Sequence, residues 1–185
     1  MAMRYLLFSC FLQLAIGSLS AQRAGHAFTP ADEGSTIDFT IKNLGFDSKG
    51  TFKGIQGTIV FDPANPAGDS FDVSIDASSV NTDNNMRDDH LRADTYFDVA
   101  RYPRISFVST SVSAVDKSGH YTVTGNLTIK GVTRPISFPF LATPAGNDYI
   151  FNGSFAINRR DFGVGGASTL SNQVTVSLTV LARRE

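Results

Sequence analysis

The sequence predicts an all-β protein of about eight antiparallel strands with one short helix. Apolar and polar residues alternate in segment after segment, which is typical of strands that bury one face. Turn-forming Gly, Pro, Asn and Asp residues separate these segments. Only one stretch, residues 84–92, has the composition of a helix, with Asn84 or Asn85 as its N-cap.

The chain opens with a segment that is typical of a secretory signal peptide, residues 1–20. Arg4 supplies a basic start, and residues 5–17 form an apolar core that is too short to span a bilayer. Small residues end the segment at Ser20. We therefore expect a single mature domain, residues 21–185, located in the periplasm or secreted.

Composition excludes several function classes for this mature domain. The one cysteine, Cys10, lies in the signal segment, which leaves no thiol for disulfides, thiol catalysis or a thiolate metal site. Without Arg4, 15 basic residues face 17 acidic ones, so the net charge is −2. The sequence has no run of Lys or Arg residues of the kind that binds nucleic acid. After the signal segment, no apolar stretch approaches the ~20 residues that a membrane-spanning helix needs.

Eight segments show the period of two. They are residues 36–41, 55–61, 71–77, 105–112, 121–130, 136–140, 149–157 and 174–180. Because each is half apolar and half polar, antiparallel pairing is expected. Phe52 is out of phase with Ile55, and Gly54 between them predicts a bulge. Such strands form either a closed barrel or a sandwich, and periodicity does not choose between them.

The second point that the sequence leaves open is how the domain uses its many phenylalanine side chains. Two of the 15 Phe residues, Phe8 and Phe11, lie in the signal segment, so the domain must bury most of the remaining 13. The inward rings either interlock in a filled core or line a cavity that encloses one ligand. Both alternatives satisfy the pattern.

Four blocks of sequence, in order, resemble the YceI-like family of periplasmic polyisoprenoid-binding proteins. They are FTIKNLGF at 39–46, the run RDDHLR at 87–92 continuing to YPRISF at 102–107, GNLTIKGVTRP at 125–135, and INRRDFGV at 157–164. Asn43 departs from the family, since many members carry His there. The resemblance implies an extended, lipocalin-like eight-stranded β-barrel that holds a long isoprenoid, such as a prenyl quinone, or another amphiphilic lipid.

The apolar face of the strands is then the expected wall of the ligand-binding bore. Its predicted lining residues are Phe39, Ile41, Phe71, Ile75, Phe107, Val123, Leu127, Phe138, Phe140 and Phe155. The expected role is transport or storage of the lipid. We expect no catalytic residue, no metal and no cofactor besides the lipid, and a homodimer stays open.

Three polar residues are candidates for contact with a ligand head group: Arg87, His90 and Arg159. The alternative is structural: Arg87 and Asp88 fix the helix to a loop, and His90 closes one end of the barrel. One arginine of Arg159 and Arg160 then pairs with an acidic residue of the helix segment, which joins the two charge-rich segments, residues 87–92 and 159–161, at one barrel end. Two further functions remain as alternatives. One is a lipid-modifying enzyme with His90 and Asp88 as an acid–base pair, and the other is a secreted interaction module with a filled core.

Overall fold

The computed structural model describes residues 25–166 and 169–185, so the predicted signal peptide lies outside the described residues. Eight strands and one α-helix follow in this order: β1 (His26–Asn43), β2 (Phe46–Phe61), β3 (Ser70–Asn81), α1 (Asn85–Arg92), β4 (Arg104–Ala114), β5 (His120–Ile129), β6 (Val132–Ala145), β7 (Asp148–Asn158) and β8 (Leu170–Arg184). Two short 3₁₀ turns, Pro66–Gly68 and Arg159–Phe162, lie in the connections before β3 and β8.

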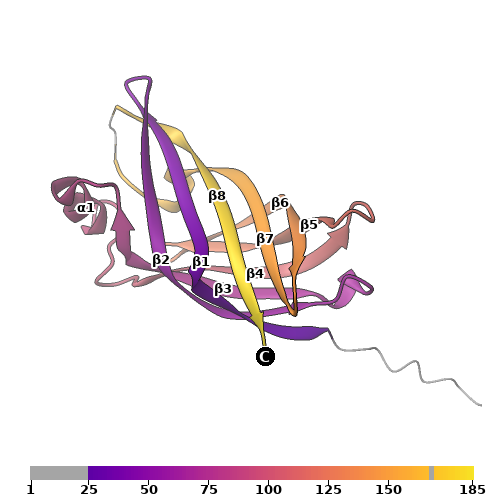
Figure 1. The fold of residues 1–185 in the computed structure, drawn as a ribbon. Coiled ribbons are helices and arrows are strands. Elements are labelled where there is room, and N and C mark those ends of the chain that lie inside the picture. The colour runs from indigo at the N-terminus through magenta and orange to yellow at the C-terminus, as the bar shows by residue number, and fades with distance from the viewer. Residues whose placement is uncertain (1–24, 167–168) are drawn as a thin grey trace, which may run out of the picture.

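Each strand pairs antiparallel with the next, and β8 pairs with β1, so the sheet closes into a barrel (Figure 1). The predicted strands and helix are therefore confirmed, and of the two open architectures the barrel is the one that forms. In residues 25–166 and 169–185, each of the eight strands therefore has a paired strand on both sides. Within the described part of the chain, no helix is long and apolar enough to cross a membrane.

The predicted bulge in β2 is present at Gly54. The register between β2 and β3 shifts on both sides of Lys53, and Gly54 has a φ of +73°, a conformation that favours glycine. The Asp32 carboxylate accepts the N–H groups of Gly54 and Ile55 at 3.0 and 2.8 Å. Because of this extra residue, Phe52 and Ile55 both point into the barrel although three positions separate them.

One end of the barrel is packed with aromatic rings. Phe61 lies at its centre, with ring centroids 4.9 Å from Tyr149, 5.2 Å from Tyr121 and 5.2 Å from Phe151. These three contacts are edge-to-face, the arrangement that aromatic quadrupoles favour. Phe61 is 1% exposed. This half of the interior is a filled core.

The helix α1 packs against β3 and lies beside the barrel wall (Figure 1). Its N-cap is Asn84, whose side chain accepts the N–H of Arg87 at 3.0 Å, as the sequence predicts. The Arg92 guanidinium, at the other end, donates to the carbonyl oxygens of Ser78 and Val80 at 2.8 and 2.9 Å. The first turn of the helix is thus capped by Asn84, and its last residue is tied to the backbone of β3.

Candidate functional site

The other half of the barrel is hollow. A cavity of about 510 Å³ extends along the axis, and its wall is made mostly of aliphatic and aromatic side chains from all eight strands and α1. That volume lies in the range typical of small-molecule pockets. The two alternatives for the Phe residues are thus both realised, one in each half of the barrel.

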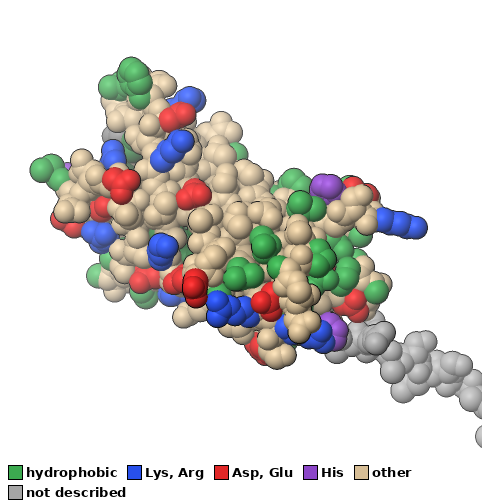
Figure 2. All heavy atoms as spheres, viewed as in Figure 1, with side chains coloured by type: hydrophobic (Ala, Val, Ile, Leu, Met, Phe, Trp, Pro, Cys, Tyr) green, Lys and Arg blue, Asp and Glu red, His purple; other side chains and the backbone are tan. Residues whose placement is uncertain are grey.

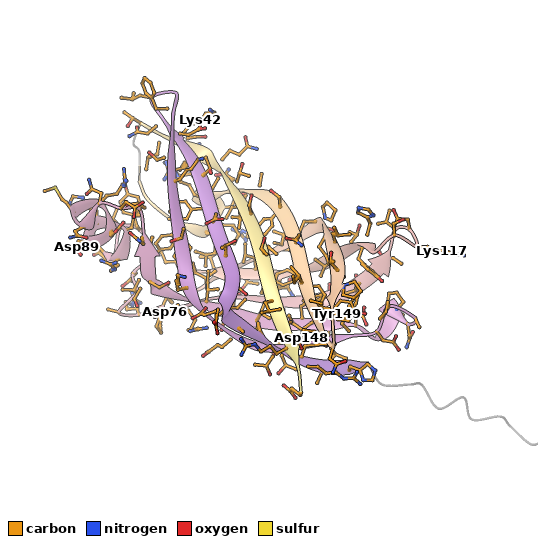
Figure 3. The ribbon with its side chains drawn as sticks, viewed as in Figure 1. Lys42, Asp76, Asp89, Lys117, Asp148 and Tyr149 are labelled. Carbon is orange, nitrogen blue, oxygen red and sulfur yellow. The ribbon has the colours of Figure 1, made fainter. Side chains whose placement is uncertain are left out.

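The cavity has a closed floor and an open mouth. Its floor is formed by Phe71, Phe140 and Phe151, whose rings contact one another at centroid distances of 5.4–6.0 Å. At the opposite end the lining includes His90 of α1 and residue Lys49 of β2, both exposed. The mouth therefore lies between the β1–β2 hairpin, α1 and the start of β8, at the end that Lys42 and Asp89 mark in Figure 3.

All ten apolar residues predicted for the bore lie on the wall of this cavity: Phe39, Ile41, Phe71, Ile75, Phe107, Val123, Leu127, Phe138, Phe140 and Phe155. Phe138 and Phe155 stack at a centroid distance of 4.5 Å on adjoining parts of the wall. Phe39 covers Gly50, where a Cβ atom would lie 2.4 Å from its ring. The polar candidates Arg87, His90 and Arg159 border the same cavity.

Sequence reasoning missed part of the wall. The lining also contains Phe52, Ile55, Ile59, Val73, Leu91, Phe97, Val174, Val176, Leu178 and Val180. The strand residues in this set share the inward face with residues that were named, so strict use of the alternation would have found most of them. Phe97 lies in the connection after α1, where no periodicity indicates a direction.

Arg87 fixes α1 to the end of β3, as the structural alternative for this residue predicted. Its Nε donates to the Thr82 hydroxyl at 2.7 Å, and one terminal nitrogen donates to the Thr82 carbonyl at 2.6 Å. Thr82 in turn donates to the buried carboxylate of Asp88 through its hydroxyl at 2.5 Å and its N–H at 2.9 Å. Arg87 nevertheless stays largely exposed beside the mouth.

The proposed pair of His90 and Asp88 does not form. The Asp88 carboxylate accepts hydrogen bonds from the N–H and hydroxyl of Thr82. Asp88 and His90 are two positions apart on the helix, so their side chains do not share a face. His90 is exposed at the rim and does not close the barrel end. The acid–base interpretation of these residues is therefore wrong on geometric grounds.

Arg159 makes a structural bridge through backbone carbonyl groups. The guanidinium, 4% exposed, donates to the carbonyl oxygens of Val164 at 2.8 Å, Ser171 at 2.9 Å and Leu170 at 3.2 Å. Burial, and secondarily the charge of Arg160, lower its pKa from the usual value. These contacts lead to the backbone before β8 and not to an acidic residue of the helix segment, because Arg159 opens the 3₁₀ turn Arg159–Phe162 in that connection.

The two charge-rich segments do meet, through other groups. The Gly165 N–H donates to the Thr95 carbonyl at 2.9 Å, which joins the connection before β8 to the connection after α1. The Lys130 ammonium lies between them and donates to the carbonyl oxygens of Gly163 and Thr95 at 3.1 and 3.4 Å. In residues 25–166 and 169–185, no group of three or more His, Cys, Asp or Glu side chains is arranged to hold a metal ion.

Comparison with known proteins places this barrel in a family. Residues 28–182 match the model of the YceI-like domain. The chain belongs to the YceI-like family. A UPF0312 protein of Yersinia pestis (strain Pestoides F) is 38% identical to this YceI-like chain over 144 residues, which is 74% of this chain and 73% of that protein.

Solved structures agree with the family fold. The crystal structure of Burkholderia cenocepacia BcnA has a TM-score of 0.77 and 28% identity, and the match covers 82% of this YceI-like chain and 98% of BcnA. A polyisoprenoid-binding domain from Saccharophagus degradans, implicated in plant cell wall breakdown, has a TM-score of 0.70, with coverage of 86% and 99%. At 15% identity it shows a shared fold.

Proposed function

We propose that this protein binds a long-chain isoprenoid, such as a prenyl quinone, or another amphiphilic lipid in its barrel, and that it carries or stores this lipid in the periplasm. The observation that carries the proposal is the cavity of about 510 Å³ with an apolar wall, a closed aromatic floor and one open mouth. A hydrocarbon tail fits such a space, since it has no polar groups to satisfy. The shared fold with a polyisoprenoid-binding domain supports the same ligand class.

The energetics favour a ligand with a substantial tail. Burying some ten chain carbons contributes about 8 kcal/mol, at about 0.8 kcal/mol for each CH₂ group. The loss of translational freedom and the ordering of a flexible tail offset a large part of this gain. A dry, apolar wall is therefore needed for useful affinity, and the inward faces of the strands supply it.

Head-group contact is assigned to the rim. Arg87 and His90 are exposed there and border the cavity, so a quinone or amide oxygen at the mouth lies within their reach. Arg159 also borders the cavity, but its N–H groups are directed at backbone carbonyls. In the proposal it holds the wall together, and it does not select the head group.

The amino-terminal segment supports the periplasmic part of the proposal. It has the basic start, short apolar core and small residues at its end of a secretory signal. Separation of the host cell into periplasmic, membrane and cytoplasmic fractions tests this part. Recovery of the full-length, unprocessed chain in the cytoplasm would contradict it.

Extraction of the protein purified from its host, followed by mass spectrometry, tests the binding. We expect a stoichiometric lipid with a long apolar tail in the extract. Delipidated protein should then bind a prenyl quinone in a titration followed by Tyr fluorescence. Protein that carries no lipid and also fails to bind the quinone would contradict the proposal.

A further inference from the structure

Three large apolar side chains are exposed at the mouth end of the barrel. Leu44 and Phe46 are 73% and 79% exposed at the tip of the β1–β2 hairpin, and Met86 is 73% exposed on α1. Figure 2 shows hydrophobic side chains at both places, on two separate projections of the molecule. Single exposed apolar residues are common, but exposed apolar groups that gather around one site mark an interaction surface, and these three surround one opening.

Both projections continue surfaces that line the cavity. Phe46 lies two residues before Ser48 on β2, so both side chains are on the inward face, and Ser48 is part of the cavity wall. Met86 lies four residues before His90 on α1, so these two share one face of the helix, and His90 also borders the cavity. The exposed residues therefore continue the faces that line the cavity outward, on two sides of the opening.

Leu44 occupies a backbone conformation that does not suit it. The hairpin turns at Leu44 and Gly45, with φ values of +49° and +86°. Turns with two positive φ values favour Asn-Gly, and a leucine there is strained because its Cβ crowds the backbone. Local structure thus does not account for an apolar side chain at this exposed position, whereas contact with an apolar partner does.

We propose that these three residues dock the barrel mouth onto the surface of a lipid bilayer, so that the tail passes between bilayer and cavity without crossing water. This inference rests on the proposed function, because a lipid ligand dissolves in the bilayer and must leave it. Two narrow projections suit insertion between head groups, whereas a stable protein interface needs about 800 Å² from each partner. Lys42, beside the hairpin tip, is paired with Asp47 at 2.9 Å, and the three anchoring side chains carry no charge. In this proposal apolar insertion therefore holds the contact, although exposed Lys49 and Arg87 also lie at the mouth.

Flotation with phosphatidylcholine vesicles tests the docking surface. We expect the mature protein to float with the vesicles at high as well as low salt, because screening weakens charge attraction and leaves apolar insertion intact. The variant Leu44→Asn/Phe46→Ser/Met86→Ser should lose vesicle binding at least about tenfold. Asn is chosen at position 44 because it tolerates a positive φ, so the variant keeps its hairpin.

The matched control is Val108→Ser/Val115→Ser. Both valines are exposed apolar residues, at 45% and 64%, but they lie on or after β4, outside the cavity wall and away from the mouth. This variant should float as the unmodified protein does. Loss of binding in the control as large as in the triple variant would overturn the proposal, because general surface hydrophobicity would then explain flotation.

A second assay separates docking from ligand binding. A fluorescent prenyl quinone is supplied either in dilute solution or already dissolved in the vesicles. If the triple variant binds it from solution normally but extracts it from vesicles at least about tenfold more slowly, the docking proposal is supported. If the unmodified protein binds the probe yet neither floats nor extracts faster than the variant, docking is overturned and the proposed function stands.

Two further outcomes would separate membrane docking from lipid binding and from dimer formation. Flotation without any binding of the probe would support the docking surface and overturn the proposed function. A dimer in sedimentation analysis that the triple variant abolishes, with no flotation, would overturn docking and assign the three side chains to a second copy of the chain.

Discussion

The carboxylate of Asp88 accepts two hydrogen bonds from Thr82, one from the hydroxyl at 2.5 Å and one from the backbone N–H at 2.9 Å. Thr82 directly follows β3, and Asp88 lies in α1 with 3% of its surface exposed. Thr82 also accepts two hydrogen bonds from the Arg87 guanidinium, one at its hydroxyl and one at its carbonyl oxygen. One threonine therefore connects the barrel wall to the helix that forms part of the cavity rim.

Replacing Asp88 with Ala should destabilise the protein by about 1–3 kcal/mol, because the buried N–H and O–H donors of Thr82 would lose their acceptor. Urea unfolding measures the change. Asp89→Ala is the matched control: this neighbour is exposed and pairs with Arg92 at the surface, so a change below about 0.5 kcal/mol is expected. Equal effects of the two substitutions would contradict the role assigned to Thr82 and Asp88.

Arg159→Lys should destabilise the connection that leads into β8. An ammonium group cannot direct donors to Val164, Leu170 and Ser171 together, as the planar guanidinium does. We expect a loss of about 2–3 kcal/mol, with faster amide hydrogen exchange in residues 164–166 and 169–171. Arg160→Lys, at the exposed neighbouring position, is the control and should change neither quantity. Unchanged exchange in Arg159→Lys would show that these contacts do not hold the connection.

Val176→Phe should block the cavity. Val176 lies on the cavity wall and is paired with Phe39 on β1 and Phe155 on β7, so a larger side chain enters the empty space. Affinity for a prenyl quinone is expected to fall at least about tenfold, while thermal stability is kept because apolar volume is filled. Thr175→Phe, which adds a similar volume on the outward face of the same strand, should bind normally. A blocked variant that still binds would place the ligand elsewhere.

Asp69 makes stability depend on pH. Its carboxylate accepts the Asp62 N–H at 2.7 Å, but Oδ2 is buried and has no hydrogen-bond partner in residues 25–166 and 169–185. Burial raises the pKa of Asp69 from 3.8 to about 7. The folded state therefore binds more protons than the unfolded state between these values, and stability falls as pH rises through this window, by up to about 1.4 kcal/mol per pH unit.

The substitution Asp69→Asn should remove this pH dependence, since the amide stays neutral and can still accept the Asp62 N–H. Unfolding free energies measured from pH 4 to pH 8 by urea titration give the comparison. Asp72→Asn, an exposed carboxyl on β3, should keep the original profile. An unchanged slope in Asp69→Asn would assign the dependence to other groups.

The sequence predicted the fold better than it predicted the use of the interior. The alternation of apolar and polar residues correctly placed Phe39 and Phe138 on the inward face, and Gly54 correctly predicted the bulge. Both features depend on the residues of one strand alone, so the sequence of that strand is enough to predict them. Whether inward rings meet each other or enclose space depends on contacts between distant strands. Phe61 fills one end only because Tyr121 and Tyr149 reach it from β5 and the start of β7.

The hydrogen-bond partners of the polar side chains near the rim could not be predicted from the sequence either. The residue types of Arg87, Asp88 and Arg159 indicated ion pairs, yet their partners are a threonine and backbone carbonyls. Carbonyl groups are present at every residue, so no pattern of residue types reveals them as partners. The mouth became recognisable only when the hairpin, α1 and the start of β8 were seen around one opening.

The aromatic floor sets a limit on depth. Phe71, Phe140 and Phe151 contact one another across the bore, so a chain that enters at the mouth stops there. Beyond a certain number of carbons, added length would remain in water and contribute no further affinity. A series of straight-chain alcohols should accordingly bind more tightly with each carbon and then reach a plateau. The depth of the barrel would thus set the length of hydrocarbon chain that binds with the highest affinity per carbon.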